Sequence, residues 1–117
     1  MDKDIIAQEI NAEYLKGYIY SIKGVRVMLD MDLAKIYGYS TKDFNRQVKN
    51  NIEKFEQDFM FQLSDEECEI LRCKNSTSGW GGRIYNPYAF TEQGIYMLMT
   101  VLKGPLATKQ SKTLIRI

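Results

Sequence analysis

Two short amphipathic segments meet at Gly38 within the stretch DLAKIYGYSTKDFNRQVKNN, and no other feature limits the possible folds of this chain as strongly. Asp30 is expected to cap the first helix, over residues 31–37, and Gly38 suits the left-handed position that ends a helix. Thr41 is expected to cap a second helix, over residues 41–51. Two short helices joined by so tight a turn predict a helix-turn-helix.

The second helix has an apolar side and a polar side. Phe44 and Val48 lie four residues apart and Ile52 extends their stripe, so this side is expected to pack inward. The outward residues are Thr41, Lys42, Asn45, Arg46, Lys49 and Asn50. Such side chains suit duplex DNA, because arginine and asparagine form paired hydrogen bonds with base edges and lysine neutralises phosphates. On the pattern alone, an ordinary helix pair with a solvated outer side is the alternative.

Alternating apolar residues predict strands beside these helices. The runs 18–22 and 25–29 flank Lys23 and Gly24, where Gly24 can take the positive φ of a tight turn, and they predict a β-hairpin. Residues 59–63, FMFQL, alternate as the residues of a half-buried strand do.

Two more short strands are expected, at residues 83–85 and 88–90. They surround Asn86-Pro87, and the proline favours an edge position or a bend because it donates no ladder hydrogen bond. With strands and helices intermixed, the sequence predicts a small single domain of the α+β class.

Three further helices are expected from their start signals. Ser64 and Glu67 stand three residues apart, as in a capping box. Thr91 is expected to cap a helix that is apolar on every side and therefore buried. Its apolar residues include Ile95, Tyr96, Leu98, Met99 and Leu102. Pro105 opens a last helix that meets no stop signal, so the chain is expected to continue into a missing region.

The composition excludes several classes of protein. The chain has 117 residues, of which 44% are hydrophobic and 26% charged, the balance of one soluble domain. No apolar run approaches the roughly 20 residues of a membrane helix. Acidic residues near the start do not fit a secretion signal, so a cytoplasmic location is expected.

The chain contains no histidine and two cysteines, Cys68 and Cys73. The absence of histidine excludes Ser-His and Cys-His nucleophilic pairs, and a zinc site would need carboxylate ligands. Two cysteines five residues apart in one helix point to different sides, so both are expected to be free thiols. We therefore expect no enzyme, no metal and no cofactor.

The formal net charge of +1 is too small to indicate a nucleic-acid partner, but the charges are segregated. Residues 53–69 hold seven acids against Lys54 alone. Residues 103–117 hold cations and no acid: Lys103, Lys109, Lys112 and Arg116. Such segregation can give one side of a domain a positive field, and the last three cations share one side of the final helix. Ordinary solvated surfaces with chance patches are the alternative.

Residues 75–82, NSTSGWGG, form a loop by composition and lead to Arg83. The glycines would let the backbone approach a phosphate, with Arg83 on a phosphate or in the minor groove. Trp80 would then lie against a sugar. Alternatively Trp80 folds back over the core, and the glycines only make a turn.

Two stretches within roughly residues 17–103 form one collinear pattern, GVRVMLDMDLAKIYGYSTKDFNRQVKNNIEKFEQDFMFQLSDEE and GGRIYNPYAFTEQGIYML. The pattern resembles the KilA-N family of phage and bacterial DNA-binding domains. The most distinctive parts are VMLDMDLAKIYG, FMFQLS and PYAFTEQG. Within the family, the chain resembles the branch that is named after a phage open reading frame six and found at the N-termini of antirepressor-like proteins.

The resemblance implies an α+β domain with a helix-turn-helix, strands and a wing-like loop, related to the APSES-type domain of certain fungal cell-cycle transcription factors. Carried onto this chain, the recognition helix is residues 41–51 and the wing is residues 76–83. Gln47 departs from the pattern, because many helix-turn-helix sequences have an apolar residue there. Val48 would take that role one position later, which would tilt the second helix.

These observations divide the chain into an N-terminal extension (1–16), a DNA-binding domain (17–103) and a C-terminal helix (104–117). The leading hypothesis is sequence-specific binding of double-stranded DNA by a phage-derived or mobile-element regulator or antirepressor. Its expected DNA contacts are Thr41, Lys42, Asn45, Arg46, Lys49, Asn50 and Arg83. The alternative is a protein-interaction module that binds a repressor protein without touching DNA, and a homodimer is left open in either case.

Overall fold

The computed structural model describes residues 15–71 and 86–116, in which strands and helices alternate irregularly along the chain. The elements are β1 (Tyr20–Ile22), β2 (Val25–Leu29), α3 (Asp30–Tyr37), α4 (Thr41–Lys49), the short 3-10 helix η1 (Ile52–Lys54), β3 (Met60–Gln62), α5 (Asp65–Leu71), β4 (Tyr88–Phe90), α6 (Glu92–Val101) and α7 (Pro105–Ile115). The expected α+β class is confirmed.

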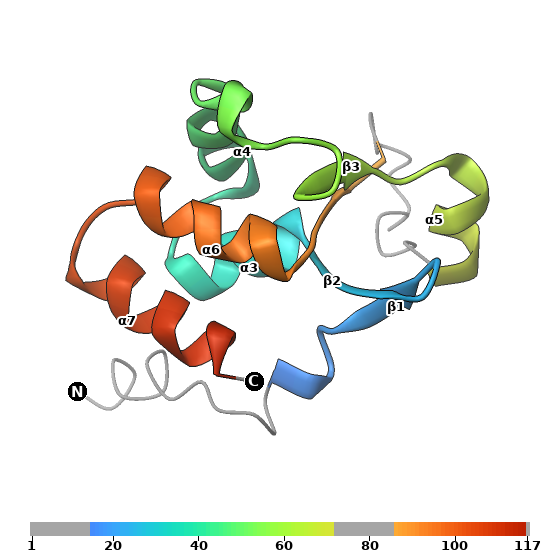
Figure 1. Ribbon diagram of the computed structural model, residues 1–117, viewed down its shortest axis with the longest axis horizontal. Coiled ribbons are helices and arrows are strands. Elements are labelled where there is room, and N and C mark those ends of the chain that lie inside the picture. Colours follow the sequence, from blue (N-terminus) through green and yellow to red (C-terminus); the bar gives the residue numbers. More distant parts are fainter. Residues whose placement is uncertain (1–14, 72–85, 117) are drawn as a thin grey trace.

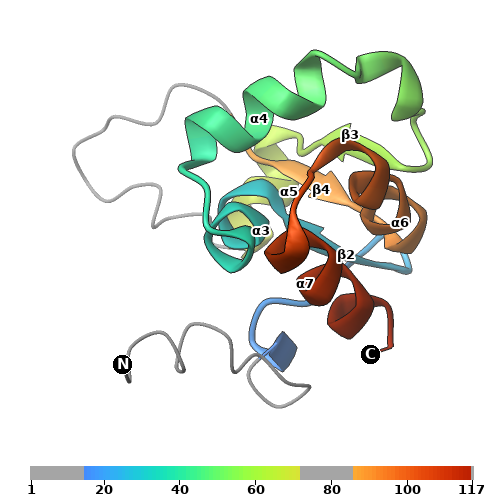
Figure 2. The ribbon, with the colours of Figure 1, turned by 90° about the vertical axis from the view of Figure 1, so that its left-hand side faces the viewer.

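The strands form one antiparallel sheet in the order β1-β2-β4-β3, with helices on both of its sides (Figures 1 and 2). Met28 and Phe90 belong to a large core that they share with side chains of α3, α4, α6 and α7. Leu29 and Ala89 belong to a smaller core with Cys68 of α5. Because neighbouring side chains of a strand point to opposite sides, the sheet separates these two cores.

β1 and β2 form the predicted hairpin, with Ile22 opposite Val25. Lys23 and Gly24 both have positive φ, 56° and 79°, as in the two-residue turn whose twist matches that of paired strands. The first strand is shorter than expected, because Tyr18 and its neighbour Ile19 lie before it and pack against the large core.

β4 lies inside the sheet, so of the two alternatives expected from Pro87, an edge position or a bend, the edge position is wrong. Ala89 lies opposite Leu29 of β2 on one side and Phe61 of β3 on the other. Pro87 stands just before the strand, where its missing N–H removes no ladder hydrogen bond. Its carbonyl still accepts a hydrogen bond from the Leu63 N–H, at 2.9 Å.

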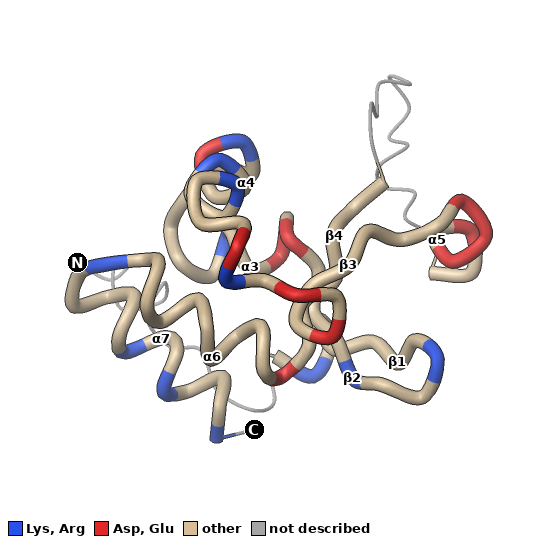
Figure 3. The backbone as a smooth tube through the Cα atoms, turned by 45° about the horizontal axis from the view of Figure 1, so that its top comes forward, with Lys and Arg blue, Asp and Glu red and all other residues tan. Residues whose placement is uncertain are grey.

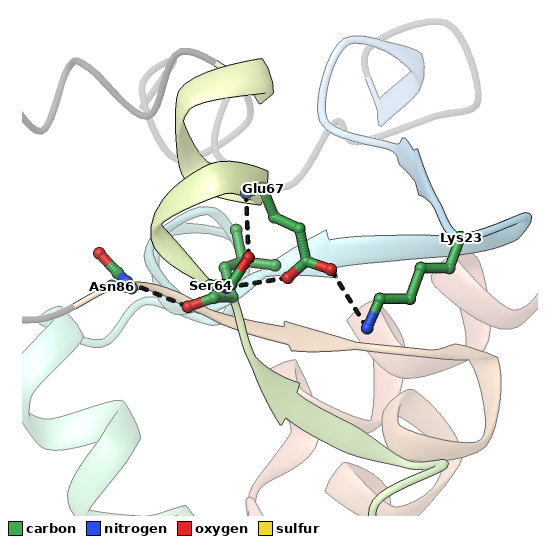
Figure 4. Close-up of polar contacts among 5 residues, drawn as sticks. Lys23, Ser64, Glu67 and Asn86 are labelled. Atoms are coloured by element: carbon green, nitrogen blue, oxygen red, sulfur yellow. Dashed lines mark hydrogen bonds and ion pairs between the residues drawn. The ribbon is translucent and has the colours of Figure 1, made fainter.

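α5 begins with the predicted capping box (Figure 4). Ser64 Oγ accepts a hydrogen bond from the Glu67 N–H at 3.1 Å, and Glu67 Oε1 accepts one from the Ser64 N–H at 2.8 Å. The second carboxylate oxygen of Glu67 lies 3.2 Å from Nζ of Lys23 in the hairpin turn. Asn86, next to β4, donates to the Leu63 carbonyl at 3.1 Å. These contacts join the start of α5 to the hairpin and to the residues that precede β4.

Cys68 is buried and disulfide-bonded, so the expectation of two free thiols is wrong. That expectation placed both cysteines in one helix, where their side chains would diverge. Cys68 lies in α5, and Cys73 lies outside the described residues.

Thr91 caps α6 as predicted, accepting a hydrogen bond from the Gly94 N–H at 3.3 Å while its hydroxyl donates to the Asp58 carbonyl at 2.8 Å. The expectation of burial on every side is wrong, because α4, α7 and β4 cover only part of this helix. Tyr96 is 51% exposed and Met99 is 36% exposed. The buried side is formed by Ile95, Leu98, Val101 and the adjoining Leu102.

Candidate nucleic-acid interface

The turn between α3 and α4 has the geometry that the sequence predicts. Gly38 adopts the left-handed conformation, with φ 81° and ψ 25°. Its N–H donates to the Lys35 carbonyl at 3.1 Å, and the Tyr39 N–H donates to the Ala34 carbonyl at 2.8 Å. This pair of hydrogen bonds is the Schellman motif, which satisfies the last carbonyls of a helix while the chain changes direction.

α4 is capped by Ser40, whose Oγ accepts a hydrogen bond from the Asp43 N–H at 3.0 Å. The prediction of Thr41 as the cap is wrong by one position, because Ser40 has the extended backbone of a cap and Thr41 is already helical. The helix ends at Lys49, with Asn50 in the C-cap position.

The inner side of α4 is fixed by aromatic packing. Phe44 is fully buried and Val48 is 3% exposed. The Phe44 ring lies 5.7 Å from the ring of Phe90 in an edge-on arrangement and 6.4 Å from that of Tyr37. Ile52 does not extend the buried stripe, contrary to expectation, because the chain has left α4 for η1 and Ile52 is 50% exposed.

The outer side of α4 carries the polar residues that the sequence singled out, and none of them is buried. In Figure 3 its basic residues stand on a helix at the surface of the molecule. Thr41 and Asn45 are half-buried, and the exposed residues are Lys42, Arg46, Lys49 and Asn50. The structure therefore leaves Lys42, Arg46, Lys49 and Asn50 accessible and places Thr41 and Asn45 closer to the body of the protein.

Arg46 forms an ion pair with Asp43, one helical turn earlier, with 2.9 Å between Nη2 and Oδ1. Both side chains are about half exposed, at 56% and 48%. Exposed ion pairs of this kind contribute about 0–1 kcal/mol, so little free energy opposes the transfer of the guanidinium to another anion.

Asn45 has a role inside the protein that the sequence did not reveal. Its Nδ2 donates to Oδ2 of Asp30 at 3.0 Å, across 15 positions of sequence. Asp30 is 1% exposed, and its Oδ1 accepts from the Met31 N–H at 2.7 Å. Asp30 was expected to cap α3, but Leu29 holds that position and Asp30 is the first helical residue. Its carboxylate therefore connects the start of α3 to the middle of α4.

A second carboxylate lies close to this contact. Burial raises the pKa of Asp32 to about 6. The charge of Lys35 opposes this rise, and the charge of Asp30 adds a smaller one. Burial, together with the charge of Asp32, also raises the pKa of the Tyr20 hydroxyl. The start of α3 is thus the part of the helix pair whose charge changes in mildly acidic solution.

Acidic residues bound the cationic surface where the chain leaves α4. Glu53, Glu56 and Asp58 are all exposed and follow the helix in quick succession (Figure 3). The segment after α4 therefore has a negative field beside the cations of that helix.

α7 presents a separate basic side, formed by Lys109, Lys112 and Arg116, all of which are exposed (Figure 3). Its opposite side is tied to α3 by polar contacts. Gln110 Nε2 donates to the Ile36 carbonyl at 3.0 Å, and the hydroxyls of Tyr37 and Ser111 share a hydrogen bond. Burial raises the pKa of Tyr37 to about 12, against the opposing effect of that hydrogen bond.

Some predicted features lie outside the described residues. They are the loop at 75–82, the strand at 83–85, the wing at 76–83, and the side chains of Trp80 and Arg83. Their predicted roles remain sequence-based predictions.

Within residues 15–71 and 86–116, no group of three or more His, Cys, Asp or Glu side chains is arranged to hold a metal ion. In the same part of the chain, no helix combines the length and the apolar character needed to cross a membrane.

A family model described as the ORF6N domain matches residues 17–101, a span that contains α3, α4, α6 and the four strands of the described residues. No curated protein and no solved structure matches the chain.

Proposed function

Because the chain belongs to the ORF6N domain family, we propose that it is a regulator of phage antirepressor type that binds double-stranded DNA sequence-specifically through α4. One observation carries the proposal: Lys42, Arg46 and Lys49 are exposed on a helix whose inner side is locked by Phe44. A helix held in this way can enter the major groove without rearrangement of the domain.

The proposed roles follow from side-chain chemistry. Arg46 forms paired hydrogen bonds with a guanine, and Asn50 reads a neighbouring base. Lys42 and Lys49 neutralise phosphates on either side of the groove, and Thr41 donates to a phosphate. The acids that follow α4 favour a docking angle that turns η1 away from the duplex.

The proposal includes a relationship to the wider KilA-N group and its winged fold. In that case residues 76–83 form the wing and Arg83 contacts the backbone or the minor groove. We propose a cytoplasmic binding protein that works without a cofactor and catalyses no reaction. The absence of histidine from the whole chain supports this, since it removes the commonest general base.

Selection of bound sequences from a random DNA pool, at two salt concentrations, tests the proposal. We expect one preferred site, with affinity that falls steeply as salt increases. Arg46→Ala should flatten the preference at one base position, at a cost of about 1–3 kcal/mol on the preferred site. Lys49→Ala should weaken binding to all sequences alike. It should also reduce, by about one, the slope of log affinity against log salt concentration.

Lys23→Ala is the matched control, since it removes a cation from the hairpin turn, on a different part of the domain from α4 (Figure 1). Its DNA affinity should equal that of the parent protein. If Arg46→Ala and Lys49→Ala fold normally and bind DNA as the parent does, α4 is not the recognition helix.

A second candidate function is the binding of a repressor protein without DNA contact. Apolar side chains exposed on the last two helices favour it: Tyr96, Met99 and Leu106 are 51%, 36% and 39% exposed. Binding of this kind would depend little on salt, whereas DNA binding depends on it strongly. A chain that enriches no sequence from the pool at either salt concentration would support the second candidate.

A further inference from the structure

The hairpin strand β2 runs past the end of β4 and leaves a sheet edge open. The β2–β4 register contains Met28 opposite Phe90 and Leu29 opposite Ala89. β2 begins three residues earlier, at Val25, where only β1 pairs with it. The first half of β2 therefore has a strand on one side and, among the described residues, no strand on the other.

The backbone of Arg26 points to this open side. Ile22 and Val25 flank the two-residue turn and form the hydrogen-bonded pair that closes the hairpin. Hydrogen-bonded and non-hydrogen-bonded pairs alternate along an antiparallel ladder, so Arg26 and Ser21 form a non-bonded pair. The N–H and C=O of Arg26 consequently face away from β1.

A groove of about 440 Å³ lies along this edge, between the hairpin, the first turn of α6 and the last turn of α7. Its apolar lining includes Ile19, Val25, Met28, Ile95, Leu114 and Ile115. Val25 is 43% exposed, so part of this lining is in contact with water. A groove of this size accommodates several side chains of an extended peptide.

The groove has a positive rim. Arg26 and Arg116 line it and are both exposed, and in the described part of the chain neither forms an ion pair. Glu92 is the only carboxylate among the described lining residues. Two exposed guanidiniums beside an apolar floor complement a segment that has both apolar and acidic side chains.

We propose that this groove binds an extended, acidic peptide segment of a partner protein, which adds to β2 as a strand. The peptide backbone pairs with Arg26, its apolar side chains enter the groove, and its carboxylates meet Arg26 and Arg116. The site is separate from α4, which lies at the top of the view in Figure 1, whereas the hairpin lies at the right and the last turn of α7 near the bottom. The inference goes beyond DNA binding and does not depend on it.

Two labelled probes test the proposal: a short peptide that alternates valine and glutamate, and its counterpart with lysine in place of glutamate. We expect the acidic peptide to bind at least about tenfold more tightly than the basic one, because like charges at the rim repel. Amide signals of β2, the first turn of α6 and the end of α7 should shift on titration. Methylation of alternate backbone nitrogens of the peptide should abolish binding, because strand addition needs those N–H groups.

The double variant Arg26→Glu with Arg116→Glu should reverse the preference and bind the basic peptide more tightly. A reversal cannot result from misfolding, which would abolish binding of both peptides. Lys109→Glu with Lys112→Glu is the matched control, because it changes the same charge on α7 at residues that do not line the groove. Arg46→Ala should bind the acidic peptide as the parent does.

Equal affinity for the two peptides, or an unchanged preference in the double variant, would overturn the proposal. So would unshifted groove signals. If the same signals instead move on dilution of the chain alone and sedimentation shows a dimer, a second copy occupies the groove and the peptide proposal is wrong.

Discussion

The side-chain amide of Asn45 donates a hydrogen bond to the buried carboxylate of Asp30, with 3.0 Å between Nδ2 and Oδ2. The contact joins the first residue of α3 to the middle of α4, so it acts across the helix pair and not within either helix. A polar group buried to this degree is tolerated only with hydrogen-bond partners around it. Asn45 thus stabilises the packing of the same helix whose outer side carries the proposed DNA contacts.

Replacement of Asn45 tests this stabilising role. Asn45→Ala removes a donor from a carboxylate that is 1% exposed, so we expect a loss of about 1–3 kcal/mol in the free energy of unfolding. Asn45→Asp should cost more, because it places a second carboxylate beside Asp30. Urea unfolding measures both, and Asn50→Ala, on the exposed end of the same helix, should change stability by less than about 0.5 kcal/mol. Equal losses of stability in Asn45→Ala and Asn50→Ala would show that the contact between Asn45 and Asp30 does not stabilise the fold.

Gly94 should not tolerate a side chain, although it lies within a helix. A Cβ at this position would lie 2.1 Å from the carbonyl oxygen of Phe59, far inside van der Waals contact with backbone atoms. Glycine to alanine in a helix usually stabilises, by about 0.5–1 kcal/mol. Here we expect Gly94→Ala to destabilise by about 1–3 kcal/mol or more, because α6 must move away from the chain that precedes β3. Thermal unfolding measures the change.

Gly17→Ala is the control for that substitution, since nothing lies within 4 Å of a Cβ built at Gly17. It should leave the melting temperature unchanged or slightly raised. If Gly94→Ala were as stable as Gly17→Ala, α6 would not approach Phe59 as closely as the structure shows.

Asp32 should make the protein less stable as the solution is brought from acid to neutral pH. Its pKa is about 6 in the folded state, above the ordinary 3.8, so the folded state binds the proton more tightly than the unfolded state. Its stabilising contribution is complete below pH 4 and disappears as the pH rises through 6. Asp32→Asn should therefore be more stable than the parent at pH 7, by about 1 kcal/mol, and as stable as the parent at pH 4. The expected difference is only this large because solvent screens the half-buried Asp32.

Glu67 provides the opposite case. The hydrogen bond from the Ser64 backbone, with the ion pair to Lys23, lowers its pKa. Glu67 therefore stabilises the fold at pH values above its pKa in the unfolded state, and this stabilisation is lost as the pH falls through its pKa in the folded state. Glu67→Gln should be less stable than the parent at pH 7, and the two should converge in strong acid. Chemical unfolding across pH measures both variants, and parallel curves for Asp32→Asn and the parent would contradict the raised pKa.

Local signals predicted most of the fold correctly. The positive φ of Gly24, the left-handed Gly38, and the caps provided by Ser64 and Thr91 all depend on residues close in sequence. Such features are decided by backbone sterics and by hydrogen bonds within a few positions. The inner and outer sides of α4 were also predicted, because Phe44 and Val48 mark them by helical spacing.

The caps of α3 and α4 were each misplaced by one residue, and the larger errors arose where distant parts of the chain compete. β4 is internal because β2 and β3 both pair with it, which Pro87 alone does not indicate. Tyr96 is exposed because no helix of the described residues covers its side of α6, and apolar character alone does not reveal that. The Asp30–Asn45 contact could not be predicted either, because it requires the crossing geometry of two helices and joins residues that each look suited to another role.

Asp43 is the residue of α4 that should oppose DNA binding. Its carboxylate lies among the cations of the outer side and holds Arg46 in an ion pair of 2.9 Å. Asp43→Asn removes this negative charge and releases Arg46, while the hydrogen bond from the Asp43 N–H to Ser40 stays intact because it belongs to the backbone. We expect DNA affinity to rise by about three- to tenfold at low salt and by less at high salt, since salt screens exposed charges.

Loss of the first-turn acid Asp43 should cost about 0.3–1 kcal/mol in the free energy of unfolding. Unfolding curves must therefore accompany the measurement of affinity, which is made by fluorescence anisotropy with the selected DNA. If Asp43→Asn instead weakens binding to the preferred site, the ion pair orients Arg46 for the groove and does not compete with it.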